Sequence, residues 1–488
     1  MFTQLYFWIF FAVVLIFYSA IYKNKALRNA YLFFISLFFY YKSGGYFFSL
    51  LIFSTIVDYT LGLLIFKTDK KLNRKIFLSL SIIVNIGVLS YFKYSYFFVD
   101  VFNSVFNTDF HVVNLLAQWT NNITGSNFNI YTIILPVGIS FYTFQTISYT
   151  FDIYRSKVKP VKNIIDFGFY VSFFPQLVAG PIVRAADFIP QLYKDYKLTK
   201  EQMGMAIFLI LNGLIKKMFI SDFISINFVD RVFDSPLSYS GFENLMAVYG
   251  YSAQIYCDFS GYTDIAIGVA SLLGFRLPIN FNSPYKAVNI SDFWRRWHIS
   301  LSSWLKDYLY IPIGGNRKGK IRTYINLMIT MLLGGLWHGA NWRFVIWGGI
   351  HGIALVIHKI WNKINPFKTK STKWSRFISI FITFHFVTFA WIFFRAKSMI
   401  VVKNIFFQMF NNFHLNLVPQ MILSYKIIFT IMLFGFIVHW LPAKVKSFYK
   451  QTFINLPVYL KVLLTVIIVI ILYQVKSSQL QPFIYFQF

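Results

Sequence analysis

The sequence predicts an all-α polytopic membrane protein, with roughly eleven to thirteen transmembrane spans and additional helices in the membrane interface. Of its 488 residues, 57% are hydrophobic and 21% are aromatic, and the mean hydropathy is +0.57. Soluble domains contain fewer apolar residues. Residues 3–22 carry no formal charge, and a stretch of this length crosses about 30 Å of hydrocarbon as a helix. Helices are favoured because the membrane core offers backbone groups no water to bond.

Further apolar stretches of suitable length recur along the chain. The first apolar stretch of the chain, residues 3–22, lacks a small-residue cleavage site, so we expect it to remain as a helix rather than to be removed as a signal peptide. No polar connection is long enough to fold as a separate soluble module. The other stretches lie at 46–66, 76–97, 131–151, 204–224, 376–394, 427–441 and 457–474.

The distribution of positive charge predicts the orientation. The formal net charge is +29, which in a soluble protein would suggest nucleic acid binding. Here Lys and Arg cluster in short connections at 23–28, 67–75 and 155–163, whereas residues 94–154 contain none. The positive-inside rule places these basic segments in the cytoplasm and the polar loop 103–127 outside, together with the N-terminus. We therefore expect no nucleic acid partner.

Residues 291–311 have the periodicity of one amphipathic helix that lies in the membrane interface. Ser291 and Asp292 are suitable for its N-terminus, and His298 falls at the border between its two faces. An anchoring role explains the basic face, whereas a border position allows His298 to point into a cavity. The apolar face comprises Trp294, Trp297, Leu301, Trp304, Leu305 and Tyr308, and the polar face Arg295, Arg296, Ser300, Ser302, Ser303, Lys306 and Asp307.

The glycine-rich basic segment 311–322 follows this helix. Backbone amides in such turns, together with Arg317 and Lys318, are candidates for contacts with donor phosphates. The spacing is not that of a P-loop, and the alternative is a cytoplasmic loop whose charge only sets the topology.

His338 lies in the segment "GGLWHGANW" (334–342), directly after an apolar run. Ionisable residues in membrane segments generally face the bundle interior or a water-filled path. A histidine there can act as a general base or carry an acyl group transiently, or it can be a neutral structural imidazole. Nearby glycines leave room for a substrate or another backbone, and Trp337 and Trp342 are candidate cavity walls.

Several other kinds of chemistry lack support in the sequence. No GxSxG elbow is present, and no HxxxH or HExxH string predicts a metal site. Cys257 is the single cysteine, which excludes an internal disulfide and a cysteine-based zinc site. We expect no metal and no bound cofactor. Four more histidines lie in apolar surroundings, and we assign structural roles to most of them. They are His351, His358, His385 and His439.

Three segments resemble the membrane-bound O-acyltransferase family, in particular its bacterial branch of alginate and peptidoglycan O-acetyltransferases. They are "QIYCDFSGYTDIAIG" (254–268), "NFNSPYKAVNISDFWRRWHISLSSWLKDYLYIPIGGNR" (280–317) and "LLGGLWHGANWRFVIWGGIHG" (332–352). The resemblance covers the chain from about residue 131 onward. It implies a bundle of about eleven transmembrane helices around a central tunnel, with His338 and His298 as the catalytic pair near its centre. Two positions depart from the family's pattern, Cys257 and Gln176, which stand where relatives often have an aromatic residue and a histidine.

We interpret the chain as a single membrane-embedded acyltransferase domain. Its parts are N-terminal helices (1–130), a catalytic core (131–400) and C-terminal helices (401–488). Asp258 and Gln254 are candidate polar groups of the tunnel, and a structural pairing of Asp258 with a cation is the alternative. Further candidates for substrate or tunnel contacts are Trp337, Asn341, Trp297 and Arg295.

The resemblance implies an O-acetyltransferase of the bacterial inner membrane. It would move acetyl from a cytoplasmic donor, with acetyl-CoA expected, toward a cell-envelope polysaccharide of the peptidoglycan, alginate or capsule type. Transfer would be direct or through a periplasmic acetyltransferase partner. The alternatives are a transporter or flippase of the same pathway without acyl chemistry, because buried histidines also relay protons, and a structural scaffold. A transporter would be expected to show inverted repeats, and we find none in the sequence.

Overall fold

The computed structural model describes residues 2–177, 180–364 and 372–475, and in these ranges it contains helices and turns but no strand. Within the same ranges, six helical segments are long and apolar enough to cross a membrane, and a bent pair would make a seventh. The predicted all-α polytopic class is therefore confirmed, while the total of about eleven spans stays a prediction. The six segments are Lys25–Lys67, Lys71–Phe106, Lys200–Asp234, Trp342–Ile364, Lys373–Arg395 and Val458–Val475.

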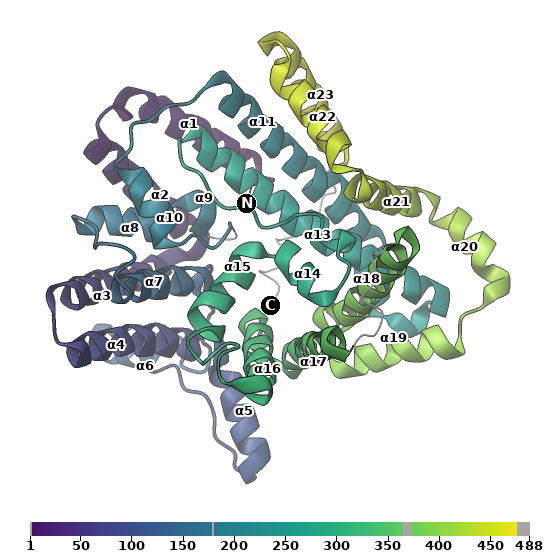
Figure 1. Ribbon diagram of the computed structural model, residues 1–488, viewed down its shortest axis with the longest axis horizontal. Coiled ribbons are helices and arrows are strands. Elements are labelled where there is room, and N and C mark those ends of the chain that lie inside the picture. The colour runs from purple at the N-terminus through teal and green to yellow at the C-terminus, as the bar shows by residue number, and fades with distance from the viewer. Residues whose placement is uncertain (1, 178–179, 365–371, 476–488) are drawn as a thin grey trace.

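The N-terminal helices form one side of the molecule (Figure 1). Among them α7 (Ile139–Tyr154) is buried along almost its whole length, because it packs against both α3 and α4. The predicted span at 131–151 is thus an interior helix that begins later than expected. The others are α1 (Leu5–Ile21), α2 (Lys25–Gly44), α3 (Phe48–Lys67), α4 (Lys71–Leu89), α5 (Ser95–Phe106), α6 (Leu115–Thr124), α8 (Ile164–Ser172), α9 (Phe174–Leu177) and α10 (Ala185–Leu192).

The long helix α13 (Gly241–Leu272) runs through the interior and packs along α11 (Lys200–Leu214). It begins with a capping box, in which the side chains of Ser240 and Glu243 each bond the other's backbone amide. Short helices follow it near the centre in Figure 1, and the C-terminal helices lie on the side opposite α2 and α3. The remaining helices are α12 (Asp230–Asp234), α14 (Ile290–Arg296), α15 (Ile299–Trp304), α16 (Gly319–His338), α17 (Trp342–Ile364), α18 (Lys373–Arg395), α19 (Met399–Asn411), α20 (Val418–Ser424), α21 (Lys426–Trp440), α22 (Ala443–Asn455) and α23 (Val458–Val475).

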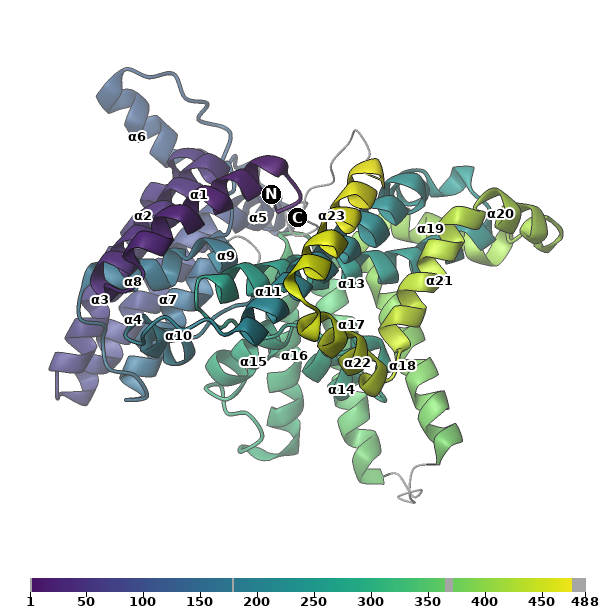
Figure 2. The ribbon, with the colours of Figure 1, turned by 90° about the horizontal axis from the view of Figure 1, so that it is seen from above.

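The two ends of the bundle carry different connections. Figure 2 shows α6 at the top of the molecule, and the end of α17 beside the start of α18 at the bottom. The helix α6 belongs to the stretch without Lys or Arg that the charge pattern places outside. The orientation of the bundle in the membrane stays a prediction from the charge pattern.

Glycines bring α16 and α17 into backbone contact. A Cβ added at Gly335 would lie 2.2 Å from the Phe344 carbonyl oxygen, and one at Gly348 would lie 2.3 Å from the Met331 oxygen. The sequence left open whether these glycines make room for a substrate or for another backbone. Gly335 makes room for the backbone of α17.

Replacing Gly335 by alanine should push α16 and α17 apart, because the added methyl group meets backbone that cannot rotate away. Overpacking of this kind costs about 1–3 kcal/mol, so we expect lower thermal stability of the purified protein in detergent, measured by fluorescence-detected size exclusion after heating. Gly349→Ala is the matched control, since its Cβ would meet the nearest atom, Leu332 Cδ2, at an ordinary 3.6 Å. Equal stability of the two variants would contradict this packing argument.

Candidate active site

His338 is the last residue of α16, and its side chain is buried among aromatic rings. The ring centroids of Trp337, Trp347 and Phe394 lie 5.0, 5.1 and 5.1 Å from that of the imidazole. These contacts come from α16, α17 and α18. Three helices thus position one histidine and surround it with apolar walls.

The C-terminal carbonyl groups of α16 are bonded by side chains from a distant segment. The Lys93 ammonium donates to the Trp337 carbonyl oxygen at 2.6 Å and to that of His338 at 3.3 Å, and the Tyr94 hydroxyl donates to that of Leu336 at 3.0 Å. The last carbonyls of a helix have no partner within it, and a cation there complements the helix dipole. Lys93 therefore fixes the helix end that carries His338. Sequence reasoning did not identify it, because nothing local links positions so far apart.

His298 lies at a break between two helices, so the prediction of one continuous helix over 291–311 is wrong. Helix α14 ends at Arg296, and His298 adopts a left-handed conformation with φ 42° before α15 begins. The N-cap is Asn289, whose side chain accepts from the Asp292 amide, rather than Ser291. Left-handed backbone is unfavourable for a residue with a Cβ and persists only where surrounding contacts enforce it.

Those contacts come from Asn280. Its carbonyl oxygen accepts from the Ile299 amide at 3.0 Å, and its side-chain oxygen accepts from the Ser300 hydroxyl at 2.6 Å. The Ser300 hydroxyl oxygen in turn accepts from the Ile182 amide at 3.0 Å. His298 is consequently fully buried at a turn that two other segments hold in place.

The two predicted histidines meet at one indole ring. The Trp337 ring centroid lies 6.1 Å from that of His298 and 5.0 Å from that of His338. Trp337 also stacks on Phe144 of α7, with centroids 5.4 Å apart. A third histidine, His351, contacts Trp347, and the same indole ring contacts His338.

The other candidates for tunnel or substrate contacts are divided between the interior and the surface. Trp297 is buried and stacks on Phe293. Asn341 is exposed at the α16–α17 turn, where its side chain accepts from the Arg343 amide at 3.1 Å. The Arg295 side chain is 71% exposed. Trp342 is 56% exposed, so its place at the surface does not fit the predicted cavity wall.

Asp258 and Gln254 are buried on α13 within a network of charged and polar groups. Asp258 forms an ion pair with Lys217, whose ammonium also lies 2.8 Å from Asp222. The Gln254 amide donates to the Ser225 hydroxyl at 2.8 Å. For Asp258 the structure shows the alternative, a pairing with a cation.

The candidate phosphate contacts Arg317 and Lys318 are exposed in the loop before α16. Gly314, Gly315 and Gly319 all have positive φ there, which explains why this turn uses glycine. Gln176, where relatives often have histidine, is buried and donates to the Tyr170 carbonyl oxygen at 2.7 Å.

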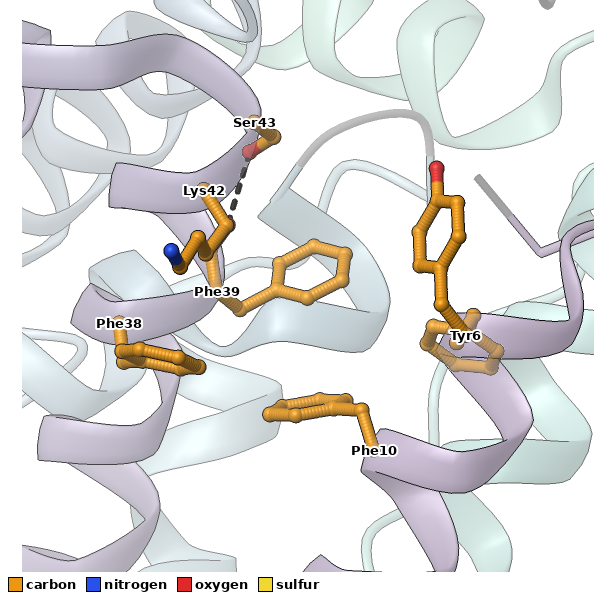
Figure 3. Close-up of a pocket in the computed structure, with 7 residues that line it drawn as sticks. Tyr6, Phe10, Phe38, Phe39, Lys42 and Ser43 are labelled. Atoms are coloured by element: carbon orange, nitrogen blue, oxygen red, sulfur yellow. Dashed lines mark hydrogen bonds between the residues drawn. The ribbon is translucent and has the colours of Figure 1, made fainter.

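A separate cavity opens between α1 and α2 (Figure 3). It has a volume of about 340 Å³, and neither His298 nor His338 lines it. Its walls are mainly aromatic, which suits contact with hydrocarbon rather than polar chemistry. The lining residues are Tyr6, Phe7, Phe10, Phe38, Phe39, Lys42 and Ser43.

The chemistry of the central site rests on two imidazoles in apolar surroundings. Histidine can accept a proton from an alcohol and return it to a leaving group, and walls that exclude water protect an activated acyl group from hydrolysis. In the described part of the chain, no group of three or more His, Cys, Asp or Glu side chains is arranged to hold a metal ion. The arrangement is suited to acyl transfer by acid–base or nucleophilic catalysis.

Comparison with known proteins identifies the family. Residues 159–403 match the model of the MBOAT, membrane-bound O-acyltransferase family. The chain is 38% identical over 408 residues to the peptidoglycan O-acetyltransferase of Helicobacter pylori, covering 77% of this chain and 72% of the relative.

Two further relatives carry related names. A probable alginate O-acetylase AlgI of Pseudomonas putida is 41% identical over 336 residues, which cover 68% of this chain and 64% of the relative. The teichoic acid D-alanyltransferase of Bacillus subtilis is 30% identical over 282 residues, covering 55% of this chain and 70% of the relative. The chain is therefore a multi-pass membrane acyltransferase that belongs to the membrane-bound O-acyltransferase family.

Proposed function

We propose that this protein moves acetyl groups from a cytoplasmic donor, acetyl-CoA, across the bacterial inner membrane for O-acetylation of a cell-envelope polysaccharide. The acceptor is reached directly or through a periplasmic acetyltransferase partner. The observation that carries the proposal is that His298 and His338 are both buried and both contact the indole ring of Trp337. The names of the relatives, peptidoglycan O-acetyltransferase and probable alginate O-acetylase, support acetyl as the group and a glycan as the acceptor.

The proposed reaction assigns His338 the proton transfer. As a base, His338 takes the proton of the acceptor hydroxyl while the hydroxyl oxygen attacks the thioester carbonyl carbon of the donor. The carbon–sulfur bond breaks, and the proton passes from the imidazolium to the leaving thiolate. In the alternative order, the imidazole nitrogen attacks first and carries the acetyl group until the hydroxyl displaces it. His298, held in a fixed turn, orients the donor or its partner imidazole.

The test uses sealed inner-membrane vesicles of both orientations and acetyl-CoA labelled in the acetyl group. Inside-out vesicles, which expose the cytoplasmic face, should transfer label to envelope glycan as base-labile ester, and sealed right-side-out vesicles should not. Vesicles from a strain lacking the gene provide the background. Equal labelling from both orientations, or labelling that does not depend on the gene, would refute the proposal.

A further inference from the structure

A second cavity lies between the end of α17 and the start of α18. Figure 2 shows these two helix ends next to each other at the bottom of the molecule. The cavity has a volume of about 560 Å³ and is bounded by α14, the end of α17 and the start of α18. Unlike the aromatic cavity between α1 and α2, it is lined mainly by polar and charged side chains. They are Lys286, Val288, Asn289, Asp292, Arg295, Arg296, His358, Trp361, Asn362, Ser375, Arg376 and Ser379.

The charges in this basic pocket are unbalanced. Asp292 is the one acid among its described lining residues, and it is shared by Arg296 at 2.9 Å and Arg295 at 3.8 Å. Lys286 and Arg376 add two more positive charges, with Lys286 donating to the Leu441 carbonyl oxygen at 2.6 Å. Burial, and then the charges of Arg296 and Arg376, lower the pKa of Lys286. Such mutual repulsion favours an anion as the occupant.

The position of the pocket adds a second argument. Trp361 and Phe377 are at least half exposed on α17 and α18, as expected where helices leave the lipid and enter the headgroup region. On its inner side, α14 contributes Trp294, which contacts His351, and Trp347 separates His351 from His338. We therefore expect the pocket to lie at a membrane surface. A series of ring contacts, from Trp294 to His351 to Trp347 to His338, connects α14 with the candidate active site.

From this geometry we infer that the basic pocket binds a phosphate ester at the inner face of the membrane. Several guanidinium groups around one cavity match the planar, multiple hydrogen bonding that phosphate oxygens accept. Two sources carry this chemistry: the nucleotide part of the acyl donor and the headgroup of an anionic phospholipid. For the donor the inference rests on the proposed function, whereas for the lipid it is independent of it. Arg317 and Lys318 do not line this pocket, and their predicted phosphate contact stays a prediction.

The test measures binding to the full-length protein in nanodiscs, in a His338→Ala background so that turnover does not interfere. One probe is labelled acetyl-CoA in neutral phosphatidylcholine nanodiscs, and the other is phosphatidylglycerol retained by the protein in native mass spectrometry. Arg376→Gln and Arg295→Gln remove pocket charges, and Lys373→Gln is the matched control, the same charge change three residues before Arg376 and outside the pocket lining. We expect each pocket variant to weaken binding of one probe about tenfold, as the loss of a charge-assisted hydrogen bond predicts, with the control unchanged.

Each outcome has a defined meaning. Weaker acetyl-CoA binding assigns the pocket to the donor, and loss of retained phosphatidylglycerol assigns it to a lipid headgroup. The inference fails if the parent His338→Ala protein binds neither probe, or if the pocket variants bind both probes as the control does. Normal gene-dependent acetylation from inside-out vesicles together with unaffected binding would leave the proposed function standing and reject the pocket. Binding that the pocket variants weaken, without gene-dependent acetylation in the vesicles, would support the pocket and reject the proposed function.

Discussion

Replacing His338 by alanine is expected to lower acetyl transfer to the glycan by about 10²–10⁴-fold, the usual contribution of a positioned acid–base group. The protein should still fold, because the lost ring contacts aromatic walls that α16, α17 and α18 continue to hold through their own packing. His338→Gln keeps a polar group of similar length without the imidazole proton chemistry, so it should lose the same activity.

The measurement is base-labile acetyl on purified envelope glycan, at matched expression of each variant, together with the amount of glycan exported. His385→Ala is the control, since this imidazole is half-buried on α18 and bonds the Phe381 carbonyl oxygen at 2.8 Å. It should retain normal acetylation. Lost acetylation with preserved export supports the enzyme, whereas blocked export favours a transporter. Wild-type acetylation in both His338 and His298 variants would favour a scaffold.

The order of the two chemical steps is accessible in the same variants. If His338 carries the acetyl group, rapid acid quenching of wild-type protein with labelled donor should leave label on the protein that hydroxylamine removes. A His298→Ala protein that still accumulates this label would place His298 in the second step. Absence of protein-bound label in both proteins would favour the general-base route.

The fold class and the two histidines were predictable because their signals are local. Long apolar stretches identify membrane helices by composition alone, and His338 is conspicuous as an ionisable residue after an apolar run. The family resemblance added that His298 belongs beside it, which the contacts of both with Trp337 support. The sequence alone did not bring these two residues together, since they lie on separate elements.

The break at His298 was missed because periodicity is a local signal. Residues 291–311 follow the helical repeat on both sides of His298, so a continuous helix is the simplest reading. The turn is imposed by Asn280, which lies outside that window and bonds Ile299 and Ser300. In the same way Lys93 reaches the end of α16 from a segment 244 residues away. Tertiary hydrogen bonds of this kind leave no pattern in a single sequence.

The ion-pair partner of Asp258 on α13 is another tertiary contact that the sequence does not reveal. A buried carboxylate on an apolar helix indicates either a functional group or a paired one, and the sequence does not specify the partner. The structure supplies it from Lys217 on the adjacent segment, with Asp222 on the other side of the ammonium. This pairing gives the largest stability effect that we expect in the chain.

Replacing Lys217 by methionine should cost about 3–5 kcal/mol of folding free energy, because it leaves buried carboxylates without their cation. The side chains of Lys217 and Asp258 are each only 3% exposed, so water cannot take the place of the lost ammonium. Lys216→Met is the matched neighbour. Its partner Asp264 is 20% exposed and keeps a hydrogen bond from Asn212 at 2.8 Å, so the loss should be clearly smaller.

Both variants are compared by the fraction of protein that stays monodisperse after heating in detergent. The double variant Lys217→Met/Asp258→Leu removes a charge of each sign, and it should recover part of the stability that Lys217→Met loses, since an apolar pair of similar volume can replace a buried ion pair. That recovery separates an uncompensated charge from simple loss of packing. If Lys217→Met were as stable as wild type, or if the double variant were worse than both single changes combined, the ion pair would not be what holds α13 against this segment.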